Sequence, residues 1–170
     1  MKQLLILIFL LSVSWSYAQK DPRTLTKEQW KEDILFLKEQ IEKNHIDPFH
    51  FQNKQEWDKA FDDLEVALPD LTYQQIVSRI ISLAASVGDG HTNARPYAAL
   101  TRYPVTFQWF GEDLRIIRIS KENSQVLGAK VLKVGGMKVK DAHNRLKTLI
   151  PAHESPTFVL GWSEYLFSLD

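Results

Sequence analysis

The chain of 170 residues contains no cysteine. This absence excludes a disulfide framework, a thiolate metal site, a cysteine nucleophile and a lipidated cysteine, so the folded chain depends on its hydrophobic core. An excess of either charge is also missing, because 21 lysines and arginines balance 21 aspartates and glutamates. A balanced charge gives no support for binding to nucleic acid or to an anionic membrane surface.

Long hydrophobic runs are absent except at the N-terminus. There Lys2 precedes an apolar run from Leu4 to Val13, and Ser16–Ala18 forms a small-x-small cleavage motif. This pattern predicts a signal peptide over residues 1–18, with cleavage before Gln19. The run is about half the length of the roughly 20 residues that span a bilayer. We therefore expect export to the periplasm or the cell exterior, with no membrane attachment after cleavage.

Three amphipathic helical patterns follow the leader. Each begins with a residue pair typical of a capping box: Thr26 with Gln29, Asn53 with Glu56, and Thr72 with Gln75. Their apolar stripes consist of Trp30, Ile34, Leu37 and Ile41, then Trp57, Phe61, Leu64 and Leu68, then Ile76, Ile80, Leu83 and Val87. We expect these helices to pack as a three-helix bundle, which forms a first domain over residues 24–95.

A β-like pattern begins after Pro96 and predicts a second, β-rich region over residues 96–170. The expected elements are a hairpin of Tyr103–Phe110 with Leu114–Ile119, a second pair of Gly128–Val134 with Met137–Val139, and a short helix capped by Asp141. The apolar stretch from Phe158 to Leu169 has no stop signal and is left without an assignment. The predicted fold class is α+β.

The segment VGDGHT, Val87–Thr92, lies between the two regions and is open to two interpretations. Glycine and aspartate are common turn residues, so the segment can simply end the third helix. Alternatively, His91 is a general base, because a histidine titrates near neutral pH and can accept a hydroxyl proton. In that case Asp89, Gly90 and Thr92 form its supporting loop. The sequence does not decide whether Asp89 or Thr92 faces the imidazole.

A histidine base requires a nucleophile, and neither G-x-S-x-G nor S-x-x-K occurs in the sequence. His45 and His50, with Asp47 between them, match a zinc site poorly because five residues across a proline-broken loop separate the histidines. We expect surface or loop-packing histidines there, and solvated side chains at His143 and His153. No metal and no cofactor are expected.

The order of these motifs resembles a known family. Helices ending in VGDGHT, then YPVTFQWF, then LGAKVLKVGGMKV and a short helix to LIP are similar to the N-terminal portion of tail-specific (C-terminal processing) serine peptidases, in the tricorn-like branch. The resemblance covers residues 24–170 and implies a PDZ-like character for the β-rich region. It also implies an exported endopeptidase that forms a serine acyl-enzyme on peptide or protein substrates.

In the tricorn-like branch, a histidine in the matching loop is the general base for a serine in a later domain, and this role corresponds to His91. In the classical branch a lysine of that later domain is the base, and His91 would be structural. The expected catalytic domain is absent before Asp170, so the resemblance predicts a truncated peptidase that is inactive alone. The alternatives are a secreted, non-catalytic peptide-binding module and a small metallohydrolase that uses Asp89 and His91.

Overall fold

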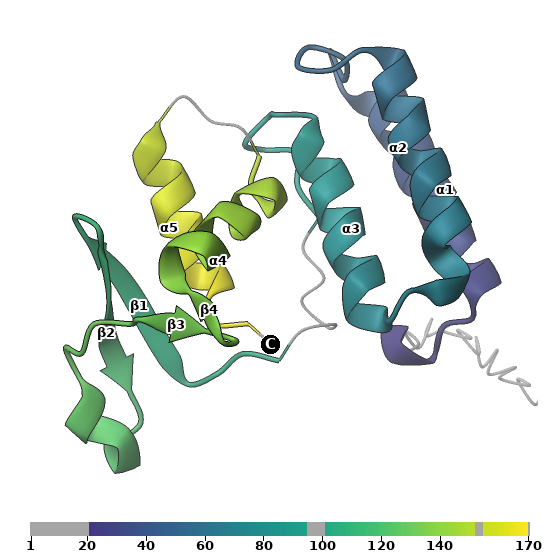
Figure 1. Cartoon of the computed structure of the whole chain (residues 1–170). Helices are drawn as coiled ribbons and strands as arrows, with labels where there is room; N and C mark the ends of the chain where they lie inside the picture. The colour runs from purple at the N-terminus through teal and green to yellow at the C-terminus, as the bar shows by residue number, and fades with distance from the viewer. Residues whose placement is uncertain (1–20, 95–100, 152–154, 170) are drawn as a thin grey trace, which may run out of the picture.

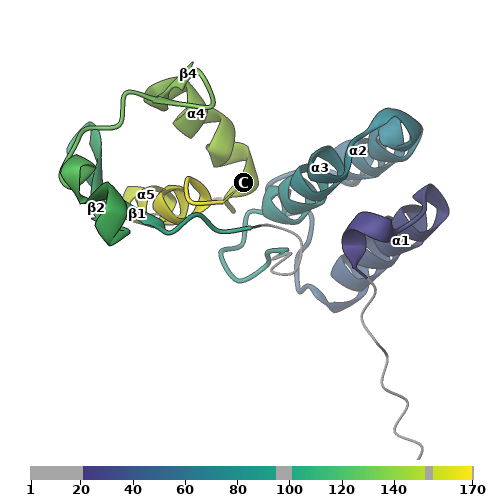
Figure 2. The same ribbon diagram turned by 90° about the horizontal axis from the view of Figure 1, so that it is seen from below.

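A computed structural model describes residues 21–94, 101–151 and 155–169. The predicted signal peptide, the predicted boundary at residues 95–96 and His153 lie outside these ranges. Within them the architecture is α+β, as predicted. In these ranges the chain forms three α-helices before the first strand and two after the last, with two small antiparallel sheets between them. Figures 1 and 2 show the N-terminal helices on one side of the molecule and the sheets with the C-terminal helices on the other.

The N-terminal half is a bundle of α1 (Lys27–Asn44), α2 (Lys54–Ala67) and α3 (Tyr73–Ser86). Short 3₁₀ helices precede it at Pro22–Thr24 (η1) and connect α2 to α3 at Leu68–Asp70 (η2). All three predicted capping boxes are confirmed, with both reciprocal hydrogen bonds present in each. Each cap satisfies backbone N–H groups that the helix leaves free, and the loss of such a cap typically costs about 1 kcal/mol.

The predicted stripes form most of the bundle core, with Trp57 fully buried between Phe49 and Phe61. Ring centroids of Trp57 and Phe61 are 4.7 Å apart. The buried face of α3 is wider than predicted, because Val77 and Ile81 are also buried. The reason is that α3 contacts α2 on one side and the 3₁₀ helix η4 (Lys147–Leu149) of the C-terminal half on the other.

The first predicted hairpin is confirmed as β1 (Val105–Phe110) paired with β2 (Asp113–Ile119), with a register shift between Thr106 and Phe107. The second pair is much shorter than predicted, because only β3 (Lys133–Val134) pairs with β4 (Met137–Lys138). The chain from residue 128 to residue 131 instead hydrogen-bonds to β2. The 3₁₀ helix η3 (Lys121–Val126) connects β2 to this segment.

The short predicted helix is α4 (Val139–Leu146), which continues into η4. The prediction that Asp141 caps it is wrong. The helix begins two residues earlier, so Lys138 is the N-cap and Asp141 lies in the first turn. No side chain caps α4, whose first backbone N–H, that of Val139, donates to the carbonyl of Leu132 at 3.1 Å.

The unassigned C-terminal stretch forms α5 (Pro156–Leu166), which packs on β1. Trp109 of β1 makes two hydrogen bonds to α5: its indole Nε1 donates to Ser163 Oγ at 3.0 Å, and its backbone N–H donates to Glu164 Oε1 at 2.7 Å. Leu114, Ala142 and Phe167 form a small second core beside these contacts. In the described ranges, no helix has the length and apolar character needed to cross a bilayer.

Candidate functional site

The VGDGHT loop leaves the end of α3 through Gly88, which has a φ of +82°. The predicted left-handed stop of the helix is therefore confirmed. A second constraint comes from the α1–α2 loop, because a Cβ atom on Gly88 would lie 2.2 Å from Cδ2 of Phe51. Glycine is thus required both by the backbone conformation and by the aromatic ring that covers it.

The Asp89 carboxylate organises the turn that follows. Its Oδ1 accepts the backbone N–H of His91 at 3.0 Å, and its Oδ2 accepts the hydroxyl of Thr92 at 2.9 Å. Gly90 lies between Asp89 and His91 in this turn. The bonds from His91 N–H and from the Thr92 hydroxyl lower the pKa of Asp89 to about 2, and burial opposes them. Asp89 is therefore a carboxylate throughout the physiological pH range.

The imidazole of His91 lies beside this carboxylate, with Nδ1 3.4 Å from Asp89 Oδ1. The structure thus decides the question that the sequence left open: Asp89 faces the ring, and Thr92 holds Asp89. The His91 side chain is 98% exposed. With its proton on Nδ1 toward the carboxylate, the ring presents Nε2 to solvent as a proton acceptor.

A second histidine, missed by the sequence analysis as part of this site, contacts the same carboxylate. His45 Nε2 lies 3.5 Å from Asp89 Oδ2, and the His45 side chain is only 16% exposed. The backbone N–H of Asp47 donates to His45 Nδ1 at 3.1 Å. Because Nδ1 accepts this bond, the proton of a neutral ring is on Nε2 and faces Asp89.

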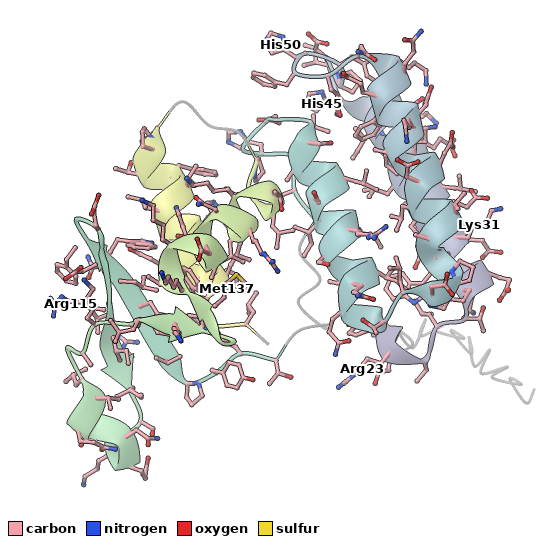
Figure 3. The ribbon with its side chains drawn as sticks, viewed as in Figure 1. Arg23, Lys31, His45, His50, Arg115 and Met137 are labelled. Carbon is pink, nitrogen blue, oxygen red and sulfur yellow. The ribbon has the colours of Figure 1, made fainter. Side chains whose placement is uncertain are left out.

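His50, by contrast, belongs to the exposed surface of the same α1–α2 loop. Its Nδ1 lies 3.3 Å from Asp47 Oδ2, and both side chains are more than half exposed. Figure 3 shows His45 and His50 at one end of the bundle, where α1 ends and α2 begins. Residues 21–94, 101–151 and 155–169 contain no group of three histidine, aspartate or glutamate side chains placed to hold a metal ion.

The imidazole of His91 can accept a proton. The serine hydroxyls near the ends of α3 and α5 do not donate to it, because they donate to backbone carbonyls. Ser86 donates to the carbonyl of Leu83, and Ser163 donates to the carbonyl of Leu160. A hydroxyl proton held in such a bond is not directed at a base. The geometry therefore provides an Asp–His pair that could activate a nucleophile brought to it.

His143 differs from the predicted solvated residue, because it is only 9% exposed. Its ring contacts the edge of Trp109, with centroids 5.0 Å apart, and its Nδ1 is buried without a hydrogen-bond partner. Burial lowers the pKa of His143, and the positive charge of Lys147 lowers it further. The neutral imidazole is therefore the form that the fold favours.

Comparison of the chain with protein-family models, with curated proteins and with solved structures found no match. The likeness to tail-specific peptidases thus remains a hypothesis carried by the motifs in the sequence. The chemical case for a function depends on the arrangement of Asp89, His91 and His45.

Proposed function

We propose that the chain is the N-terminal region of an exported serine endopeptidase in which His91 is the general base. The observation that carries this proposal is the imidazole of His91, which is fully open to solvent on one side and faces an ionised carboxylate on the other. Thr92 and His45 also contact this carboxylate, so Asp89 is held in a position from which it can orient the ring.

In the proposed reaction, a serine from a further domain donates its hydroxyl proton to His91 Nε2 as its Oγ attacks the peptide carbonyl. The imidazolium then returns this proton to the leaving amine as the C–N bond breaks, and water hydrolyses the acyl-enzyme by the same route. Asp89 orients the ring and stabilises the imidazolium. It does not take the proton, because its pKa of about 2 is far below that of a histidine.

The β-containing region, residues 101–169, has the proposed role of holding the peptide substrate as a PDZ-like module. PDZ-type recognition adds a peptide strand to a sheet and accommodates alternate side chains in apolar pockets. Apolar side chains are available for such contacts, since Ile117, Leu127 and Leu132 are each more than 40% exposed. The same observation supports the second candidate function, a peptide-binding module without catalysis.

A fluorophosphonate probe tests the proposal, because it reacts with a serine only when a base activates the hydroxyl. The protein to use is the product of the complete reading frame that contains residues 1–170. We expect labelling at a serine, and we expect His91→Ala to slow it by about 10²–10⁴-fold, the usual contribution of a general base. The fold should be unchanged because the His91 side chain is exposed.

His50→Ala is the matched control, since His50 is also an exposed loop histidine beside an aspartate. It should label at the unaltered rate. Equal labelling of the His91→Ala and unsubstituted proteins would remove His91 from the mechanism and leave it a turn residue. A complete protein that binds peptides but never reacts with the probe would instead support the non-catalytic module.

A further inference from the structure

A cavity of about 720 Å³ lies between the two halves of the molecule. Its walls come from α3, α4, η4 and α5. It extends to Phe51 and to Gly88 of the VGDGHT segment. Cavities of 300–1,000 Å³ are typical of sites for small ligands. None of the proposed steps at His91 uses this cavity.

The wall of the cavity is predominantly apolar. Ala85 of α3, Ile150 after η4, and Val159 and Leu160 of α5 supply much of it. These side chains favour an apolar occupant, because burial of its hydrocarbon surface is worth roughly 25 cal/mol per Å². An ordinary polar metabolite would lose its hydration here without gaining enough hydrogen bonds.

The polar residues that line the cavity include basic side chains. They are His143, Lys147 and the hydroxyl residues Ser82, Ser86 and Thr148, and no acidic residue of the described ranges lines the cavity. The imidazole of His143 is buried with Nδ1 unpartnered. Lys147 takes part in no ion pair with the described residues, whose ion pairs lie elsewhere on the surface. Because Lys147 is exposed and no described acidic residue lines the cavity, a single anionic group of a ligand would meet a positive charge on this side.

We propose that the cavity binds a small amphipathic monocarboxylate, with its hydrocarbon body between α3 and α5 and its carboxylate beside His143 and Lys147. A ligand in this position contacts both halves of the molecule at once. Its binding favours the arrangement in which the halves are joined, and so stabilises the whole chain in proportion to ligand concentration.

Isothermal titration of the purified chain with three eight-carbon compounds tests the ligand class. Octanoate, octanol and octylamine share a hydrocarbon body and differ in charge. We expect octanoate to bind with a Kd of about 0.1–1 mM, a reasonable affinity for so few atoms. Octanol should bind more weakly, and octylamine at least tenfold more weakly than octanoate. Equal affinities for octanoate and octylamine, or no binding of octanoate at 10 times the expected Kd, would overturn the proposal.

Two kinds of variant test the location. Lys147→Gln should weaken octanoate binding about threefold to fivefold, as expected for a partly exposed ion pair, whereas Lys140→Gln on the same segment should have no effect, because Lys140 does not line the cavity. Val159→Phe narrows the cavity from α5 and Ser82→Leu narrows it from α3, so each should weaken octanoate binding several-fold. An octanoate affinity that is unchanged in whichever of these variants folds would place the ligand elsewhere.

A last titration separates a free acid from a peptide terminus. Ala-Ala-Leu with a free carboxylate and the same tripeptide as its amide should both bind more weakly than octanoate, since the peptide groups lose water in an apolar cavity. A free-carboxylate tripeptide that binds tighter than octanoate would overturn the small-molecule assignment in favour of a peptide C-terminus. The titrations need no catalysis, so their failure would leave the proposed role of His91 untouched.

Discussion

Twelve buried apolar side chains form one core in the helical bundle, whereas the corresponding cluster in residues 101–169 contains Leu114, Ala142 and Phe167. The two regions also differ in how their helices begin. Capping boxes begin α1, α2 and α3, but no side chain caps α4 or α5. The bundle is thus specified by local signals and a shared core, while the β-containing region depends more on contacts between distant segments.

This contrast has a consequence for stability. Seven partly buried apolar residues pack against this three-residue cluster and nine pack against the bundle core, so the β-containing region still buries less apolar surface and gains less from the hydrophobic effect. Its other support is the contact between α3 and η4, which places Leu149 against the bundle core. We therefore expect the β-containing region to unfold before the bundle.

The largest effects should come from substitutions in the two cores. Trp57→Ala should destabilise the bundle by about 3–5 kcal/mol, and Leu114→Ala should destabilise the β-containing region by about 2–5 kcal/mol, because both side chains are fully buried. Urea unfolding followed by far-UV circular dichroism measures mainly the helices, and the indole N–H signal of Trp109 in NMR spectra measures the β-containing region. Leu114→Ala should move the transition of the β-containing region alone.

Val66→Ala is the control for these two variants, because Val66 is 80% exposed and its loss should change stability by less than about 0.5 kcal/mol. A single transition, followed identically by both signals and shifted as a whole by Leu114→Ala, would show that the two cores unfold as one unit.

A glycine-to-alanine substitution should lower the free energy of unfolding in one region and raise it in the other. Gly88→Ala places a Cβ 2.2 Å from the Phe51 ring at a φ of +82°, so it should destabilise by more than about 2 kcal/mol. Gly161→Ala, inside α5 with open space around its Cβ, should stabilise by about 0.5–1 kcal/mol. Thermal unfolding of both variants measures the difference.

Phe51→Ala distinguishes the two causes at Gly88. In its background, Gly88→Ala should cost only about 1 kcal/mol, because the collision is gone and the backbone strain remains. A cost that is unchanged by Phe51→Ala would show that the ring does not constrain the loop.

The smallest effects should appear in the pH dependence of the free energy of unfolding. The pKa of His143 in the folded protein lies below its ordinary value of 6.5, so its contribution to stability is present above pH 6.5 and is lost as the pH falls through the folded value. The pKa of Asp89 falls from 3.8 to about 2, so its contribution is present above pH 3.8 and is lost toward pH 2.

Urea unfolding as a function of pH measures these contributions in each region. His143→Phe should remove the loss that begins at pH 6.5, which we expect in the transition of the β-containing region. Asp89→Asn should reduce the loss of bundle stability between pH 4 and pH 2. A His143→Phe protein that loses stability below pH 6.5 as the unsubstituted protein does would assign the effect to another group.

Elements of the fold could be predicted from the sequence wherever residues close together in the chain determine them. A capping box needs residues three apart, so the starts of α1, α2 and α3 followed from single pairs such as Thr72 and Gln75. The Ser155-Pro156 pair is a comparable signal for α5, since proline favours the first helical turn, and attention to it would have found the missed helix. The hairpin of β1 and β2 likewise followed from alternation around a turn.

Contacts between distant segments could not be read in this way. His45 and Asp89 come from different loops, and only the fold of the bundle brings them together. His143 seemed solvated because the sequence shows it on a short polar helix, whereas its burial depends on Trp109 from another element. The composition of VGDGHT indicated a turn and a possible base, but the orientation of Asp89 required the fold.

The bond between Trp109 N–H and Glu164 also covers part of the outer edge of β1. The N–H group points away from β2, where a strand of another molecule could otherwise pair with β1 and begin an aggregate. Glu164 occupies this donor with a charged side chain held by α5. A strand that paired with β1 at Trp109 would have to displace this carboxylate, so the contact with α5 disfavours strand addition at this position.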